Sequence, residues 1–438
     1  MKVLVVGGGG REHALCWKLR QSPLISELYC APGNPGIAEV ADLVPIRAEE
    51  IHKLADFAGD IGIGLTVVGP ELPLSLGLAD ELSARGLPVF GPTQAAAEIE
   101  SSKVFSKQFM VRHGIPTAQF AIAHERAEAE AAARDFGLPV VLKADGLASG
   151  KGVLIPRDEE ELVAALDTFF AERRFGASGD RVVVERCLVG DEVTFMVLSD
   201  GIRALPLAAC RDYKRLGDDD TGPNTGGMGA HSPAGVLDRD VAADVLERVV
   251  RPTIEGLDGE NRPLRGVLYV GLMLTAEGPK VLEFNARFGD PETQALMLRL
   301  EDDLLPVLQA GAAGSFGVSR LQWRHEAAAC VVLASAGYPG VPSKGEPIVG
   351  VEAAAAVEGV HVFHAGTARR EGELVTAGGR VLNVCASGVS LREALQRAYG
   401  AVTLVSWPGK VYRRDIGRAS LELTESQGWP PSGVTRPV

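Results

Sequence analysis

Three apolar runs near the N-terminus each end in a loop of glycine or proline, and this pattern constrains the fold more than any other feature. The runs are 2–6, 28–31 and 65–68, and the loops after them are 7–10, 32–36 and 69–73. A helical pattern over 12–20 separates the first two runs. Strands that alternate with helices predict an α/β fold with a parallel, doubly wound sheet. Ligands of such sheets bind at the carboxyl ends of the strands, where these loops lie.

The overall composition excludes two classes of partner. The formal net charge is −13, whereas nucleic-acid binding needs a basic surface, so we expect no nucleic-acid partner. No apolar run reaches the roughly 18 residues of a membrane span. The apolar stretch at the N-terminus is also too short for a signal peptide. We therefore expect no membrane association and a cytoplasmic location.

The rest of the chain divides by pattern into further parts. A compact α/β unit around a glycine-rich loop is predicted over 120–190, and a pair of strands is predicted over 266–285. Between them, 215–233 is rich in glycine, asparagine and proline and is expected to be a long loop. From about 326 the pattern predicts a separate α+β domain. The final residues, 429–438, are expected to be disordered.

The first glycine run, 7–10, suits a phosphate better than a nicotinamide dinucleotide. Glu12 stands where a dinucleotide fingerprint has its third glycine, and no acidic residue ends the second strand. The glycines can present backbone N–H groups to a phosphate at a helix N-terminus. Arg11 can add charge-assisted hydrogen bonds. The alternative is a tight turn between strand and helix that binds no ligand.

The second glycine-rich loop follows a lysine at the end of an apolar strand. Lys143 at that position needs an anionic partner or a route to water. Gly152 follows Lys151 where a Walker loop requires Ser or Thr, so this is no Walker motif. Glycines give a loop the freedom to close over phosphates, which makes Gly150 and Lys151 candidates for that contact. The alternative is a plain β-hairpin with a solvated lysine.

A third apolar strand ends in Glu185, shortly before Leu188 and Glu192. A hinge of this kind can offer backbone groups to adenine and a carboxylate to ribose hydroxyls. The alternative is a solvated glutamate at a strand end.

Alternating polar residues on one predicted strand are the candidates for a metal site. Glu283, Asn285 and Arg287 are two residues apart and therefore project on one face. Two oxygen ligands suit Mg²⁺, which few protein groups hold together with substrate phosphates. Arg287 can stabilise charge on a phosphoryl group during transfer. The alternative is a surface strand with one ion pair.

Six motifs occur together in one order. They are GGREHA at 9–14, APGN at 31–34, VGPE at 68–71, KADGLASGKGV at 143–153, DTGPNTGGMGA at 220–230 and EFNARFGDPETQ at 283–294. In this combination they resemble the phosphoribosylamine–glycine ligase family over about residues 1–425. Members usually carry Asn or Ser where Gly9 stands, so backbone contacts are expected there rather than side-chain contacts.

The resemblance implies an ATP-grasp fold in four domains. The implied parts are an N-terminal pre-ATP-grasp-type domain at 1–100, a central ATP-grasp domain at 101–119 and 191–325, a small α+β ATP lid at 120–190, a C-terminal α+β domain at 326–425 and a tail at 426–438.

The resemblance also implies an ATP-dependent carbon–nitrogen ligase of de novo purine biosynthesis. Such an enzyme joins glycine to 5-phosphoribosylamine and forms glycinamide ribonucleotide, ADP and phosphate through a glycyl phosphate. ATP with Mg²⁺ or Mn²⁺ is then expected, the partners are small molecules, and the chain is a monomer or a weak homodimer. Another ATP-grasp carboxylate–amine or carboxylating ligase, a non-catalytic nucleotide-binding protein and a nicotinamide-dependent dehydrogenase are the alternatives.

Roles for individual residues follow from the same resemblance. The implied catalytic residues are Lys143, Asp212 and Arg287, and the implied metal ligands are Glu283 and Asn285. The implied nucleotide-binding residues are Lys103, Lys143, Gly150, Lys151, Glu185, Leu188 and Glu192. The implied substrate-binding residues are Gly10, Arg11, Glu12, Gly33, Asn34, Glu71, Asp212 and Arg287.

Overall fold

The computed structural model describes residues 1–147, 152–235 and 237–426, and it confirms a mixed α/β fold. The N-terminal part is a five-stranded parallel sheet in the order β3-β2-β1-β4-β5. Its elements are β1 (Lys2–Gly7), α1 (Gly10–Leu19), β2 (Glu27–Pro32), η1 (Ile37–Glu39), β3 (Asp42–Leu43), α2 (Ile51–Asp60), β4 (Leu65–Val68), α3 (Glu71–Ser75), α4 (Leu78–Ala84) and β5 (Val89–Phe90).

The central strand of this sheet is apolar throughout because helices cover both of its faces. Val3 and Val5 belong to the core cluster on the side of α1, and Leu4 and Val6 belong to the cluster on the side of α2. The parallel sheet predicted from the alternation of apolar runs and glycine loops is therefore confirmed.

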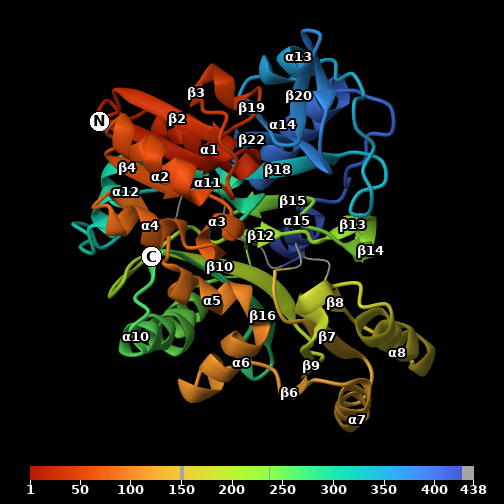
Figure 1. Ribbon diagram of the computed structural model, residues 1–438. Coiled ribbons are helices and arrows are strands. Elements are labelled where there is room, and N and C mark those ends of the chain that lie inside the picture. Colours follow the sequence, from red (N-terminus) through yellow and green to blue (C-terminus); the bar gives the residue numbers. More distant parts are fainter. Residues whose placement is uncertain (148–151, 236, 427–438) are drawn as a thin grey trace.

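A small antiparallel sheet, in the order β6-β9-β7-β8, forms the lid. The chain reaches it through α5 (Gln94–Ser101) and α6 (Lys103–Arg112). The lid consists of β6 (Phe120–Ala123), α7 (Arg126–Phe136), β7 (Val140–Ala144), β8 (Val153–Leu154), α8 (Glu159–Leu166), η2 (Asp167–Ala171), η3 (Gly176–Gly179) and β9 (Val182–Arg186). Figure 1 shows it at the opposite end of the molecule from the N-terminal sheet.

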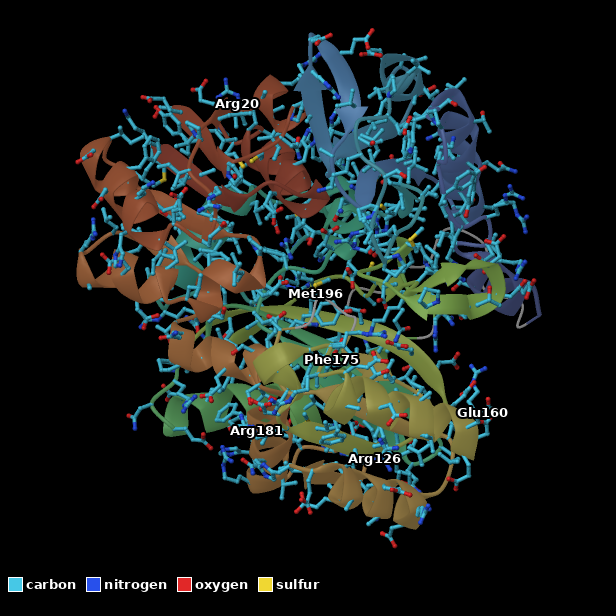
Figure 2. The ribbon with its side chains drawn as sticks, turned by 45° about the vertical axis from the view of Figure 1, so that its right-hand side comes forward. Arg20, Arg126, Glu160, Phe175, Arg181 and Met196 are labelled. Carbon is cyan, nitrogen blue, oxygen red and sulfur yellow. The ribbon has the colours of Figure 1, made fainter. Side chains whose placement is uncertain are left out.

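The central sheet is antiparallel, in the order β11-β10-β16-β17. Its part of the chain comprises β10 (Asp191–Asp200), β11 (Ala204–Pro206), α9 (Arg239–Val245), η5 (Leu246–Val250), α10 (Arg251–Gly259), β16 (Arg265–Thr275), β17 (Gly278–Asn285), α11 (Glu292–Arg299) and α12 (Leu304–Ala312). Figure 2 shows Met196 of β10 between Arg20 of the N-terminal part and Arg126 and Glu160 of the lid. The central sheet thus lies between the other layers, where both can contribute residues to one site.

The fourth sheet has the order β12-β15-β18-β22-β19 and combines strands from distant parts of the chain. The elements in the earlier part of the chain are β12 (Arg211–Asp212), β13 (Arg215–Gly217), η4 (Asp218–Asp220), β14 (Thr221–Asn224) and β15 (Gly229–Ser232), of which β13 and β14 pair only with each other. The later elements are β18 (Ala327–Ala334), α13 (Val351–Ala355), β19 (Val360–His364), β20 (Thr367–Arg370), β21 (Glu373–Thr376), β22 (Arg380–Gly388), α14 (Leu391–Leu404) and α15 (Arg418–Ser426). This sheet joins strands from both sides of residue 326, and the predicted domain boundaries remain a prediction.

The expectation of a long loop at 215–233 is wrong in part. β13 and β14 pair as a hairpin, and β15 pairs with β18. Gly229 explains why glycine belongs in this strand, since a Cβ there would lie 2.7 Å from the carbonyl oxygen of Cys330. Glycine here permits a close approach between strands, so a composition typical of loops concealed a strand.

Two features of the described ranges bear on earlier expectations. No helix among residues 1–147, 152–235 and 237–426 has the length and apolar character needed to cross a membrane. The expected disorder of 429–438 concerns residues outside the described part of the chain.

The first turn of α1 is a junction of three parts of the fold. A Cβ on Gly10 would lie 2.1 Å from Nδ2 of Asn383 on β22 and 2.8 Å from Nε2 of Gln294 on α11. Close by, the backbone N–H of His364 donates to Nδ1 of His13 at 2.8 Å. Glycine at position 10 is therefore required because the central and C-terminal parts pack directly against the backbone of α1.

We predict that Gly10→Ala lowers the free energy of unfolding by about 1–3 kcal/mol, the usual cost of overpacking a core. Gly400→Ala on α14 is the matched control, because nothing lies within 4 Å of its Cβ position. There alanine should stabilise the helix by about 0.5–1 kcal/mol. Urea denaturation of both variants measures the difference, and equal midpoints would contradict the packing argument.

Candidate active site

A cleft of about 740 Å³ lies where the four parts of the fold meet. The predicted residues that line it are Arg11, Glu71, Lys103, Lys143, Glu185, Leu188, Glu192, Asp212, Glu283, Asn285 and Arg287. The structure therefore brings together the candidates for nucleotide binding, metal binding and catalysis, although they are spread over residues 11–287.

The alternation of side chains on β17 sets one wall of the cleft. Glu283 and Asn285 line it, and so does Arg287 just beyond the strand. Phe284 and Ala286 are fully buried in the core below. From Glu283 onward this is the division of faces that the two-residue spacing predicts. Leu282, which the same spacing puts in the core, lines the cleft instead, beside an irregularity in the pairing of β17 with β16.

Glu283 lies among ammonium groups. Its Oε2 is 3.4 Å from Nζ of Lys103, and its Oε1 is 3.7 Å from Nζ of Lys214. Burial opposes ionisation, but the charges of Lys103, Lys214 and Lys143 outweigh it and hold the pKa of Glu283 well below its usual range. The side chain is therefore a carboxylate at neutral pH.

Lys143 has the anionic partner that its position requires. Its Nζ lies 2.8 Å from Oε1 of Glu185 and donates to the carbonyl oxygen of Leu282 at 2.9 Å. The other oxygen of Glu185 accepts a hydrogen bond from Nζ of Lys107 at 2.8 Å. Burial of Glu185 opposes ionisation, yet the two lysines lower its pKa. No individual role was predicted for Lys107, which follows Lys103 by one helical turn.

Asp212, on β12, titrates differently from Glu283 and Glu185. Its side chain is only 6% exposed. Burial raises the pKa of Asp212 to about 7, and although Lys214 opposes this effect, the nearby Glu292, Glu192 and Glu283 add to it. A group with this pKa can accept a proton near neutral pH.

Lys214 is a cleft residue that sequence reasoning missed. It pairs with Glu192 and lies 4.0 Å from Oδ2 of Asp212. Burial opposes its charge, but Glu192 and Asp212 raise its pKa well above the usual value. The sequence signal that could have identified Lys214 is its position two residues after Asp212, because side chains two residues apart on an extended segment project on the same face.

Arg287 is held by two carboxylates from the start of the chain. Its Nε lies 3.3 Å from Oε2 of Glu71, on α3, and 3.3 Å from Oε1 of Glu100, on α5. Glu100 also accepts the backbone N–H of Ala286 at 2.7 Å. Burial opposes the charge of Arg287, but Glu100 and Glu71 raise its pKa. These ion pairs hold the guanidinium beside the candidate metal ligands Glu283 and Asn285. Glu100 is a further cleft residue that belongs to no sequence motif.

Several predicted substrate-binding residues do not line the cleft, namely Gly10, Glu12, Gly33 and Asn34. Glu12 accepts hydrogen bonds from the backbone N–H of Gly9 and from Nε of Arg11, both at 2.6 Å. Asn34 donates to two carbonyl oxygens and accepts from two backbone N–H groups. These side chains hold the glycine loop, and their contact with substrate remains a prediction. Gly150 and Lys151 lie outside the described residues.

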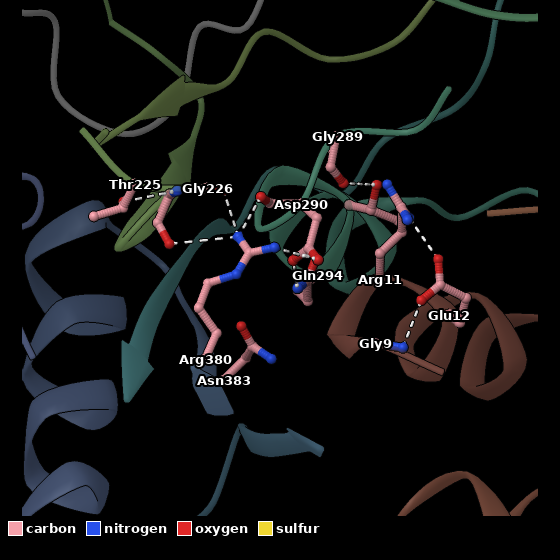
Figure 3. A network of polar contacts seen from close by, with 12 residues as sticks. Gly9, Arg11, Glu12, Thr225, Gly226, Gly289, Asp290, Gln294, Arg380 and Asn383 are labelled. Carbon is pink, nitrogen blue, oxygen red and sulfur yellow. Dashed lines mark hydrogen bonds and ion pairs between the residues drawn. The ribbon is translucent and has the colours of Figure 1, made fainter. Parts of the chain in front are cut away.

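Arg380, at the start of β22, extends from the C-terminal domain to the rim of the cleft (Figure 3). Its Nη2 pairs with Oδ2 of Asp290 at 2.8 Å, and its Nη1 donates to the backbone oxygens of Asp290 and Gly226. The N–H of Gly226 donates to Oη of Tyr338 at 2.9 Å. Arg380 and Tyr338 belong to none of the sequence motifs. Only the fold brings them to this rim of the cleft.

A central antiparallel sheet that faces a smaller four-stranded lid across a lysine-lined cleft defines an ATP-grasp protein. Models of the phosphoribosylglycinamide synthetase N domain, ATP-grasp (A) domain and C domain match residues 1–100, 101–293 and 328–419. The chain belongs to the phosphoribosylglycinamide synthetase family.

Curated relatives cover nearly the whole chain. A Rhizobium meliloti protein named phosphoribosylamine–glycine ligase is 50% identical over 417 residues, which are 95% of this chain and 98% of the relative. A Vibrio cholerae protein of the same name is 48% identical over 430 residues, which are 98% of this chain and 100% of the relative.

Solved structures agree with this placement. The crystal structure of phosphoribosylamine–glycine ligase from Thermotoga maritima has a TM-score of 0.82 at 36% identity and covers 95% of this chain and 100% of its own. A biotin carboxylase domain from Hydrogenobacter thermophilus, solved with MgADP and bicarbonate, has a TM-score of 0.70 at 17% identity and covers 94% of this chain and 91% of its own. The latter likeness shows the fold alone.

The raised pKa of Asp212 predicts an inverse dependence of stability on pH. Between about pH 4 and 7 the folded state keeps a proton that the unfolded carboxyl releases, so this group lowers stability as pH rises. The Asp212→Asn substitution removes this fall in stability with rising pH. The variant should gain stability relative to the wild type by up to about 1.4 kcal/mol per pH unit from pH 5 to 7 and then level off. Urea denaturation measures this, and a difference that stays constant with pH would contradict the assignment.

Proposed function

We propose that this protein joins the carboxylate of glycine to the amino group of 5-phosphoribosylamine with conversion of ATP to ADP and phosphate, as a ligase of de novo purine biosynthesis. The observation that supports it most is the single cleft in which lysines surround an ionised Glu283 beside Arg287 and Asp212. Family membership and full-length relatives that bear the name phosphoribosylamine–glycine ligase support the choice of substrates.

The nucleotide side of the proposal rests on the lid and the central sheet. Lys103 and Lys143 are charged groups for the phosphates. Glu185 and Leu188 lie at the hinge for adenine, and Glu192 is the candidate for the ribose hydroxyls. All of these residues line the cleft.

Glu283 and Asn285 fit a divalent metal ion, Mg²⁺ or Mn²⁺. They offer oxygen donors on the same face of β17, and Glu283 is ionised. Among the described residues no group of three or more His, Cys, Asp or Glu side chains forms a dedicated metal cage. This agrees with an ion that takes its other ligands from phosphates and water. When bound, such an ion neutralises phosphate charge and orients the phosphoryl group.

The proposed chemistry has two balanced steps. A carboxylate oxygen of glycine forms a bond to the γ-phosphorus as the bond to the β-phosphate oxygen breaks, which gives glycyl phosphate and ADP. The amine nitrogen then forms a bond to the carbonyl carbon, phosphate leaves, and a proton leaves the nitrogen. Arg287 stabilises charge on the transferring phosphoryl group, and Asp212 accepts the proton.

The phosphoribosylamine side of the proposal involves Arg11 and Glu71, which line the cleft, and the glycine loops beside them. A cytoplasmic location and a monomer or weak homodimer belong to the same proposal. The six free cysteines agree with a reducing compartment.

The test is release of ADP with ATP, Mg²⁺, glycine and freshly generated phosphoribosylamine, with one component omitted at a time. We expect ADP only when glycine and the amine are both present. ADP release that requires bicarbonate instead of glycine would replace this proposal with a carboxylating ligase, whose fold biotin carboxylases share.

We predict that Glu283→Gln lowers kcat by at least about a hundredfold, because loss of a metal ligand removes several kcal/mol of transition-state stabilisation. The fold should remain intact by circular dichroism. Glu277→Gln, on the exposed turn of the same hairpin, is the control and should keep wild-type turnover. Near-normal turnover of the Glu283 variant at limiting Mg²⁺ would rule out the assignment.

A further inference from the structure

Lys107 is a buried lysine outside the lining of the cleft, and the chemistry above gives it no role. It lies on α6 one turn after Lys103, and its residue is only 2% exposed. Lys103 faces the cleft, whereas Lys107 lies below the cleft floor and does not line it. A buried ammonium group is costly unless it is paired, so its partners indicate its purpose.

Lys107 has one partner in the lid and a second that is hydrogen-bonded to the central sheet. Its Nζ donates to Oε2 of Glu185 at 2.8 Å and to Oγ1 of Thr117 at 2.7 Å. Thr117 in turn donates to the carbonyl oxygen of Val281 on β17 at 2.7 Å. Burial lowers the pKa of Lys107 to about 8, so the group still carries its charge at neutral pH.

Glu185 connects Lys107 to the cleft. One of its oxygens contacts Lys107, and the other contacts Lys143, which lines the cleft and also donates to the carbonyl oxygen of Leu282. Two ammonium groups and one carboxylate leave a net charge of +1 on this cluster. Without Lys107, Glu185 would neutralise Lys143 alone, and the cleft floor would lose the positive charge that attracts phosphates.

We propose that Lys107 is a positioning residue for nucleotide binding, which holds the carboxylate of Glu185 and thereby keeps the ammonium group of Lys143 directed into the cleft with its charge available. The inference rests on the proposed function, in which this part of the cleft binds the phosphates of ATP. It adds a residue that never touches the nucleotide but determines how strongly the cleft binds it.

Titration calorimetry of the full-length protein with MgADP tests this. Lys107→Met should weaken MgADP binding by at least about tenfold, because a charge-assisted contact at the phosphates is lost. Lys107→Arg keeps the charge and should restore most of the affinity. Lys280→Met, on β17 and paired with Glu277 outside the cleft, is the control and should bind as the wild type does. In turnover assays, KM for ATP should rise while KM for glycine stays unchanged.

A double variant covers the case in which Lys107→Met does not fold. Glu185→Gln combined with Lys107→Met leaves no unpaired carboxylate, and its affinity should equal that of Glu185→Gln alone, because Lys107 acts only through Glu185. A further tenfold loss in the double variant, or wild-type affinity of Lys107→Met, would overturn the inference. Failure of the wild-type protein to bind MgADP would instead overturn the proposed function.

Discussion

The burial of opposite charges beside one another is the constraint on which this cleft depends. Glu283 and Glu185 remain ionised because lysines surround them, and the lysines are tolerated there because the carboxylates balance them. A single buried charge without its partner costs several kcal/mol, so neither set exists without the other. Asp212 differs from these two, because too few cations offset its burial and its pKa rises to about 7, and burial also raises the pKa of Glu100. One cleft therefore contains carboxylates that stay ionised and carboxylates whose pKa burial raises.

The same constraint ties the cleft to the arrangement of the domains. Arg287 follows β17 but is paired with Glu71 and Glu100, which precede the lid in the chain. Arg380 reaches from the C-terminal part to Asp290 beside α11 (Figure 3). If the N-terminal, central and C-terminal parts separated, each would leave a charged side chain exposed or without its ionic partner. The chemistry of the cleft and the packing of the domains are therefore maintained by the same contacts.

Local patterns predicted the parallel N-terminal sheet and the face of β17, because strand alternation and glycine loops depend on neighbouring residues only. The same reasoning failed at 215–233, where the packing of a strand against β18 demanded glycine and hid the strand. It also predicted no individual role for Lys107 and missed Arg380, because Glu185 and Asp290, their ionic partners, are distant in sequence. Asn34 illustrates the opposite case, since its motif was identified but its amide is satisfied by backbone groups.

Transfer of oxygen from glycine to phosphate tests the central claim, carboxylate activation in this cleft, most directly. The full-length enzyme would turn over ATP and phosphoribosylamine with glycine labelled by ¹⁸O in both carboxyl oxygens, and mass spectrometry would follow the label. Because phosphate leaves with the oxygen that attacked the γ-phosphorus, each inorganic phosphate should carry one ¹⁸O, and the product amide should keep the other. Unlabelled phosphate, formed with normal product, would contradict the account.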